Sequence, residues 1–270
     1  MSFAISLNLL MAFLFPSFEA TLNSRINIMP VDKETYKKIS TALALKHVDL
    51  VAVSKTKSVA DIFELYQLGQ RDFGENYVQE LAEKHLLLPH DIRWHFIGHL
   101  QSNKVKYIAP FVHLIQGVDS FKLLREINRQ AEKNHRTIQC LLQAHIAQEE
   151  TKFGLNEAEL DELFADLAKT AATGELKFIK IVGLMGMASF TENINKVKLE
   201  FKYLKFLFDK FSDLSMANLP AYARETSAEQ VGQGGCQLST LSMGMSSDYK
   251  LAIEEGSNMV RIGSLLFGER

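Results

Sequence analysis

DLVAVSKTKSVADIFELYQLG, residues 49–69, contains the unit from which the fold can be predicted. Its first part is a short run rich in β-branched residues, which predicts a strand. Its second part, with Ser58 as a cap and Gly69 at the end, predicts a helix. Lys55 and Lys57 lie at the junction, where burying a charge is costly. Each lysine is therefore either a surface charge or a nucleophile placed in a pocket.

The strand–helix unit recurs along the chain, which indicates one α/β domain. The predicted strands are short apolar runs without clean alternation, as is typical of parallel strands buried on both faces. Eight repeats in about 240 residues indicate a single-domain (β/α)8 barrel. A doubly wound open sheet is the alternative, because strand order cannot be read from the sequence. Strands are expected within residues 49–55, 71–77, 92–98, 112–120, 137–146, 178–188, 237–244 and 257–268.

The N-terminal segment falls outside this repeat. Residues 3–15 form an apolar run that is short for a membrane span. A secretory signal has basic residues before such a run, but the first basic residue here, Arg25, follows it. A poor signal peptide, a disordered tail and translation begun upstream of a natural start at Met29 are the alternatives, of which we favour the last. We expect residues 1–28 to be a poorly ordered or non-native extension and residues 29–270 to form the barrel.

A second segment without periodicity is predicted late in the chain. Residues 212–237 are rich in small, polar and glycine residues. A stretch of this length is either functional or disordered, and we expect a flexible insertion.

Composition narrows the classes of function. The chain has 270 residues, 47% of them hydrophobic and 23% charged, which fits a globular protein without a membrane role. Lys and Arg number 30 and Asp and Glu number 32, with no long basic tract, so nucleic acid is not an expected partner. Cys140 and Cys236 lie far apart in no redox or metal spacing, which suits a reducing cytoplasm.

The expected reactive face of such a barrel is the set of strand carboxyl ends. The residues found there are mostly hydrogen-bonding groups with a single well-placed lysine. They are Lys55, Glu75, Asn76, His95, Gly98, His99, Gln143, His145, Met185 to Met187, Ser246, Ser247, Arg261, Gly263 and Ser264.

The last two units carry the clearest chemical pattern, that of a phosphate site. In SMGMSSDYKLAI, Ser246 or Ser247 is a candidate helix cap, and in MVRIGSLLFG, Gly263 and Ser264 open a short helix. Helix starts with Gly and Ser offer N–H and hydroxyl groups to an anion. In (β/α)8 barrels a phosphate site commonly follows strands seven and eight.

Arg261 shares strand parity with Gly263 and lies within an apolar strand. It needs a partner, either a carboxylate in a barrel-end salt bridge or an acceptor on a ligand. The residues alone leave both alternatives open.

Two further patterns have structural interpretations. His95 and His99 have zinc-like spacing, but that spacing requires a helix and here crosses a strand and its exit loop, so no metal site is expected. The methionines near two predicted strand ends are expected to fill the core. They are Met185, Met187, Met243 and Met245.

Seven motifs together give the chain a family resemblance. AVSKTK, FGENYVQE, WHFIGHLQSNKVK, KFGL, GLMGMA, LSMGMSSDY and MVRIGSLLFGER occur in order from about Leu50 to Arg270. The chain thereby resembles the pyridoxal 5′-phosphate homeostasis protein family. That family is similar in fold to the barrel domain of alanine racemase and binds pyridoxal 5′-phosphate (PLP) through a lysine imine.

The resemblance implies a role for each motif residue. Lys55 would form the imine, Asn76 would lie beside the cofactor ring, and Arg261 would lie near the pyridine nitrogen. The phosphate would be held by Ser246, Gly263 and Ser264, with Met245 and Ser247 as further contacts.

Strand parity supports the choice of lysine. Val51, Val53 and Lys55 would share the inward face of one strand. Lys57 lies past the expected strand end and is predicted to be solvated or a rim charge.

The chemistry implied is that of a cofactor carrier. Arginine cannot supply an acidic partner to the ring nitrogen, so the ring should remain a weak electron sink, which leaves racemisation or carriage. Racemisation needs a second acid/base, which alanine racemase takes from a further domain and its partner subunit. We therefore expect a cytoplasmic, monomeric, non-catalytic protein that buffers PLP or delivers it to PLP-dependent apoenzymes. The alternatives are a weak amino-acid racemase, and a cofactor-free barrel hydrolase or isomerase with Lys55 as base.

Overall fold

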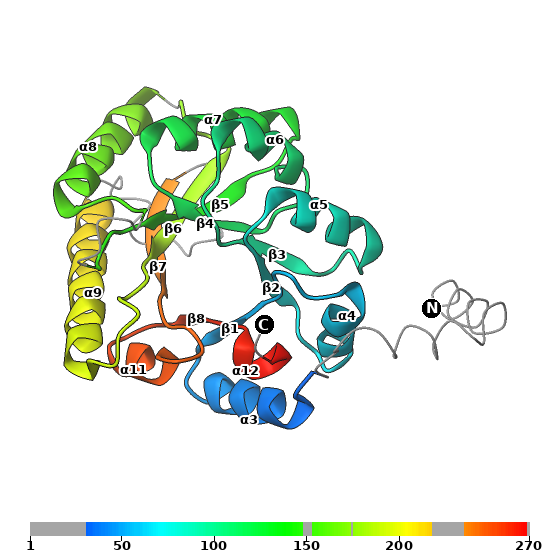
Figure 1. Cartoon of the computed structure of the whole chain (residues 1–270). Helices are drawn as coiled ribbons and strands as arrows, with labels where there is room; N and C mark the ends of the chain where they lie inside the picture. Colours follow the sequence, from blue (N-terminus) through cyan, green and yellow to red (C-terminus); the bar gives the residue numbers. More distant parts are fainter. Residues whose placement is uncertain (1–30, 148–152, 174, 218–234, 269–270) are drawn as a thin grey trace.

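The strands of this protein close into a parallel barrel. The computed structural model describes residues 31–147, 153–173, 175–217 and 235–268. Each strand pairs in parallel with the next along the chain, and the eighth pairs with the first. Figure 1 shows the helices outside the ring of strands. The predicted (β/α)8 barrel is confirmed, and the open sheet is excluded by the β8–β1 pairing.

The elements have the following bounds. The strands are β1 (Asp49–Val53), β2 (Asp72–Glu75), β3 (Arg93–Phe96), β4 (Leu114–Val118), β5 (Ile138–Gln143), β6 (Ile179–Met185), β7 (Gly235–Ser242) and β8 (Met259–Ile262). The helices are α3 (Lys33–Ala44), α4 (Val59–Gln67), α5 (Val78–Leu87), α6 (Val105–Ile108), α7 (Phe121–Lys133), α8 (Glu157–Thr173), α9 (Ile194–Ala217), α11 (Tyr249–Glu254) and α12 (Ser264–Phe267), with a 3-10 turn, η1 (Ser102–Lys104). Among the described helices, none is both long and apolar enough to cross a membrane.

Local sequence signals explain where several helices begin. Ser58 accepts a hydrogen bond from the Asp61 N–H while the Asp61 carboxylate accepts one from the Ser58 N–H, so the predicted cap is a full capping box. The cap of α11, in contrast, is Asp248. The prediction of Ser246 or Ser247 at that position is wrong, because both serines lie in the turn before the helix.

Both ends of residues 212–237, the segment predicted to be a flexible insertion, are regular structure. Helix α9 continues through residues 212–217, and β7 already includes residues 235–237. Leu214, Met216 and Ala217 are good helix formers, and the first helix breaker, Pro220, follows them. Residues 218–234 and the N-terminal residues 1–30 lie outside the described part of the chain.

The barrel separates two apolar clusters. The larger one lies between strands and helices, and the smaller one consists of inward residues. Inward and outward residues alternate, as Trp94 and Phe96 show by packing in the outer cluster on either side of inward His95. Met185 belongs to the interior cluster, as expected for core filling. The five buried members of that cluster are Val51, Leu114, Leu141, Met185 and Met259.

Barrel closure brings the two ends of the described chain together. Val51 is in register with Arg261, and Ala52 with Ile262. A Cβ on Gly263 would lie 3.1 Å from the carbonyl oxygen of Val53, so the exits of β8 and β1 are in close contact. The turn that contains Lys55 therefore lies beside the start of α12.

The turn between β7 and α11 depends on Gly244, which gives a stability prediction. Its φ is +96°, and a Cβ there would lie 2.6 Å from the Cβ of Ala252. Gly69 has a similar φ of +104° with nothing within 4 Å. We expect Gly69→Ala to cost about 1–2 kcal/mol through backbone strain alone, and Gly244→Ala to cost about 1–3 kcal/mol more through the added clash.

Urea unfolding of the two variants measures this difference. Equal losses of unfolding free energy would contradict the close packing at Gly244.

Candidate functional site

Lys55 lies in the turn that follows β1, at the carboxyl end of the barrel. The strand ends at Val53, two residues earlier than predicted, and Lys55 is half-buried. Strand alternation therefore does not fix the direction of its side chain. The neighbouring residues Ser54 and Thr56 do constrain its backbone, through two sets of contacts with α5 and β2.

The first set is a buried ion pair below Ser54. Lys84, in α5, donates to the Ser54 carbonyl oxygen at 2.7 Å and to Glu75 Oε1 at 2.7 Å. Ser54 Oγ donates to the same carboxylate oxygen at 2.6 Å. Burial raises the pKa of Glu75, and the Lys84 ammonium counteracts that effect. Glu75 lies at the carboxyl end of β2, as predicted, and its carboxylate pairs with Lys84 behind the turn.

The second set holds Thr56. Its N–H donates to Glu80 Oε1 at 2.6 Å, and that oxygen also accepts from Lys84 at 2.6 Å. Thr56 has a φ of 65°, a conformation that costs energy for a residue other than glycine and persists only where the surroundings impose it. The residues on both sides of Lys55 are thus fixed by one ionic cluster, Glu75, Glu80 and Lys84.

Lys57 has a structural contact. Its Nζ donates to the carbonyl oxygens of Phe267 at 2.9 Å and Gly268 at 3.3 Å, at the end of α12. Of the two predicted alternatives, a solvated side chain is wrong, since closure of the barrel brings these carbonyls within reach, and a rim charge is not contradicted. Lys57 ties the turn after β1 to the C-terminal helix.

Asn76 lies at the end of β2, against the exit of β3. A Cβ on Gly98 would clash with the carbonyl oxygen of Asn76, so only glycine lets the two segments approach this closely. The Asn76 Oδ1 atom is buried and accepts no hydrogen bond from the described residues. A buried acceptor of this kind is costly unless a ligand or water satisfies it.

The turns after β7 and β8 are joined to each other. The Gly263 N–H donates to Ser246 Oγ at 3.2 Å, which leaves the Ser246 hydroxyl hydrogen for another acceptor. Gly263 caps α12 and Ser264 opens it, as predicted. Asp248 Oδ1 accepts from the Met245 N–H at 2.6 Å and so orders the turn that precedes α11. Ser247 is exposed.

Arg261 is the buried cation of the site. Its guanidinium is 4% exposed and donates to Ser242 Oγ at 2.6 Å and to the Gly186 carbonyl oxygen at 2.9 Å. Burial lowers its pKa to about 10, and the charge of Asp248 counteracts that effect. Within the described residues no carboxylate is hydrogen-bonded to this guanidinium, so the salt-bridge alternative is wrong there. The alternative of an acceptor on a ligand remains.

The two histidines with zinc-like spacing have separate partners. His95 faces the barrel interior, where Nε2 lies 3.0 Å from Asp72 Oδ1, so its predicted place at the rim is wrong. His99 Nδ1 lies 3.1 Å from Asp119 Oδ2. In the described segments, no group of three or more His, Cys, Asp or Glu residues could hold a metal ion.

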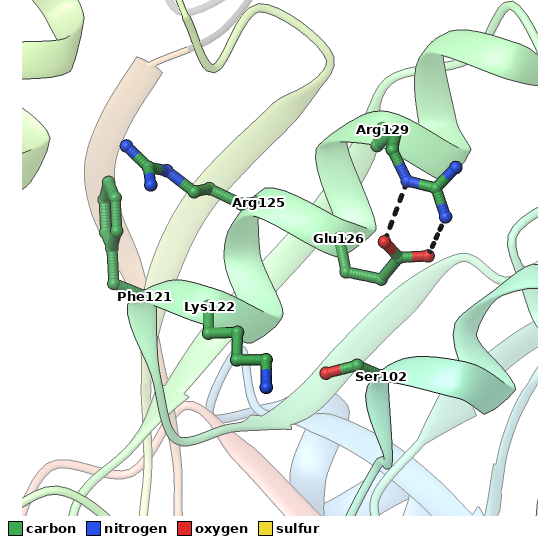
Figure 2. Close-up of a pocket in the computed structure, with 6 residues that line it drawn as sticks. All are labelled: Ser102, Phe121, Lys122, Arg125, Glu126 and Arg129. Atoms are coloured by element: carbon green, nitrogen blue, oxygen red, sulfur yellow. Dashed lines mark hydrogen bonds and ion pairs between the residues drawn. The ribbon is translucent and has the colours of Figure 1, made fainter.

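A hollow of about 390 Å³ on the outer surface contains none of the predicted site residues. It lies between η1 and α7, and Figure 2 shows Glu126 in it paired with Arg129. Its lining residues are Ser102, Phe121, Lys122, Arg125, Glu126 and Arg129. It is therefore separate from the site at the carboxyl ends of the strands.

The groups at the strand ends suit a small anionic ligand that carries a carbonyl. A primary amine, a buried guanidinium and a hydroxyl with a free hydrogen come from Lys55, Arg261 and Ser246. Sequence reasoning missed the supporting residues Glu80 and Lys84. The spacing of four residues between them on a helix is common in exposed ion pairs, so it gave no sign of a contact with the turn at Lys55.

Comparisons with known proteins place the chain among PLP-related proteins. A family model described as alanine racemase, N-terminal domain, matches residues 33–270. The chain is 39% identical over 222 residues to a pyridoxal phosphate homeostasis protein of Aquifex aeolicus, covering 82% of this chain and 86% of that one. A Pasteurella multocida protein of the same name is 37% identical over 226 residues, covering 83% and 87%.

A solved structure agrees with these relatives. PipY of Synechococcus elongatus with PLP bound is 30% identical, with a TM-score of 0.71, and the match covers 87% of this chain and all of that one.

The ionic cluster gives a prediction about stability. Lys84→Met leaves Glu75 buried without its cation, and we expect a loss of about 3–5 kcal/mol in unfolding free energy. Lys38→Met is the matched control, because its partner Glu34 and Lys38 itself are 87% and 78% exposed. That change should cost no more than about 0.5 kcal/mol.

Urea unfolding measures both changes. Adding Glu75→Gln to Lys84→Met should restore part of the loss, since it removes the uncompensated charge. A Lys84→Met protein as stable as the Lys38→Met control would show that the cluster is not a buried ion pair.

Proposed function

This chain belongs to the pyridoxal phosphate homeostasis protein family, within the alanine racemase N-terminal domain family, and from this we propose that it binds PLP as an imine with Lys55. We propose further that it buffers or delivers the cofactor without robust turnover. The observation that carries the proposal is Arg261, a guanidinium buried at the strand ends and bonded by neutral acceptors alone in the described chain. A buried cation of this kind is suited to a ligand with a negative charge and a ring acceptor.

The residues present fit PLP in the chemistry of their donors. Ser264 offers its N–H at the start of α12, and Ser246, held by the Gly263 N–H, offers its hydroxyl hydrogen, so we propose that these three residues form the phosphate site. Met245 and Ser247 lie in the same turn and are proposed as further contacts. The buried Asn76 Oδ1 lacks a donor among the described residues and suits a hydroxyl on the ring.

Lys55 would provide the covalent attachment. Its neutral amine adds to the aldehyde carbon, a water molecule leaves, and a C=N bond remains. The contacts of Ser54 and Thr56 with the ionic cluster hold the backbone at Lys55. Little backbone entropy would therefore be lost when the imine forms.

Arg261 favours carriage over catalysis. PLP supplies an electron sink whose strength depends on a proton at the ring nitrogen. With its pKa at about 10, the Arg261 guanidinium stays protonated at neutral pH and acts only as a donor. It would therefore leave the pyridine nitrogen of PLP unprotonated, which disfavours transamination and decarboxylation. Curated relatives named homeostasis proteins support the same conclusion.

The proposed oligomeric state, cellular location and recipient proteins are those expected of a cofactor carrier. We propose a monomer in the cytoplasm that passes PLP to PLP-dependent apoenzymes. Its two cysteines, Cys140 and Cys236, are both free thiols, which suits a reducing compartment.

An absorption spectrum tests the attachment. Protein mixed with PLP should show the absorption band of an imine, and Lys55→Ala should abolish it. Lys57→Gln is the matched control two residues away, and it should keep the band because Lys57 contacts α12. Loss of the band in Lys57→Gln with retention in Lys55→Ala would assign the wrong lysine, and no band in the unmodified protein would contradict PLP attachment.

Hydrogen exchange tests the absence of robust turnover. The PLP-loaded protein is incubated with L-amino acids in deuterated water, and Cα deuterium is measured by mass spectrometry. We expect incorporation no faster than with free PLP. Incorporation at enzymatic rates that is lost in Lys55→Ala would favour the weak-racemase alternative.

A further inference from the structure

A chain of hydrogen bonds crosses the barrel interior from Arg261 to Asp72. Arg261 Nη1 donates to Ser242 Oγ at 2.6 Å, and Ser242 Oγ donates to Gln116 Oε1 at 2.8 Å. Gln116 Nε2 lies 3.0 Å from His95 Nδ1, and His95 Nε2 lies 3.0 Å from Asp72 Oδ1. The first four members are no more than 4% exposed. They come from β8, β7, β4 and β3, and Asp72 comes from β2.

When His95 carries a single ring hydrogen, the two ends determine the direction of every bond in this chain. A guanidinium can only donate, so Ser242 accepts from Arg261 and must place its own hydrogen toward Gln116. Gln116 therefore presents Oε1 to Ser242 and Nε2–H to His95. His95 then accepts at Nδ1 and carries its hydrogen on Nε2, which faces the carboxylate of Asp72. With a bare His95 Nδ1, turning the Gln116 amide round would place its Oε1 against that nitrogen, so two acceptors would face each other.

The far end keeps this direction fixed because Asp72 stays ionised. Burial alone would raise its pKa, but hydrogen bonds from His95 and Arg93 outweigh that effect and lower it to about 2. Arg93 Nε donates to Asp72 Oδ1 at 2.7 Å, so the carboxylate is held from the start of β3 as well. Asp72 therefore remains an acceptor at any pH where the protein is expected to work.

We propose that Gln116 and His95 are positioning residues that fix the guanidinium of Arg261 for the cofactor. This inference rests on the proposed function. A serine hydroxyl can rotate, and Ser242 keeps a lone pair toward Arg261 because its hydrogen is engaged by Gln116. Without the hydrogen bond to Gln116, the Ser242 hydroxyl could rotate away from Arg261. The long, flexible Arg261 side chain would then lose one of its two acceptors.

The first test uses the protein without cofactor. Nitrogen-15 NMR should show His95 with its hydrogen on Nε2 and a bare Nδ1. In Gln116→Glu, a carboxylate replaces the Nε2–H group that faced Nδ1, so His95 should become protonated on both nitrogens. A hydrogen on Nδ1 in the unmodified protein, or an unchanged His95 in Gln116→Glu, would overturn the proposed chain.

The second test measures the effect on the site. Gln116→Met keeps the side-chain length and removes both hydrogen bonds. With PLP added, it should shift the absorption maximum of the bound cofactor in the same direction as Arg261→Gln and weaken binding by about three- to tenfold. The control is the same substitution at buried Gln130 in α7, which bonds Glu126 outside the barrel. Gln130→Met should leave spectrum and affinity unchanged.

The outcomes separate this inference from the proposed function. A bound-cofactor band that is normal in the unmodified protein and unchanged in folded Gln116→Met would overturn the positioning role alone. The absence of any band in the unmodified protein would contradict the proposed function, and the positioning role would fall with it. If Gln116→Met does not fold, Ser242→Ala breaks the same chain and is read by the same spectrum.

Discussion

The pairing of β1 with β8 is the constraint on which the candidate site depends. Residues about two hundred positions apart in sequence meet there, with Val51 in register with Arg261. The close approach of Gly263 to Val53, and the bonds of Lys57 to the end of α12, hold the two exits together. Because of this closure, the turn that contains Lys55 and the turn that we propose to bind the phosphate lie on one rim.

Two sets of contacts hold charged side chains in the low-polarity interior. Arg261 donates to two neutral acceptors, Ser242 Oγ and the Gly186 carbonyl oxygen. Glu75 is buried with Lys84, and these two residues together with Glu80 bind the backbone on both sides of Lys55. Buried ion pairs contribute little net stability, but their loss is costly because one charge is left alone. Their value here is that they fix the geometry of the rim.

Local signals allowed the fold and part of the site to be predicted from sequence. The Ser58 capping box, the start of α12 at Ser264 and the repeating strand–helix unit depend on neighbouring residues, which a sequence shows directly. The partners of Glu75 and Arg261 could not be predicted, because they depend on which strands and helices meet in space. His95 illustrates the same limit.

His95 alternates with the aromatic residues Trp94 and Phe96 in β3, and it faces inward to Gln116, which lies twenty-one residues later in the chain. Strand alternation does not extend to Lys55 for a related reason. The strand stops where the ionic cluster binds Ser54, and no local pattern marks that point.

Borohydride reduction of the PLP-loaded protein, followed by peptide mass spectrometry, identifies the lysine that holds the cofactor. We expect one reduced PLP adduct per chain, on Lys55. Adducts spread over surface lysines, or an adduct on Lys57, would contradict attachment at Lys55.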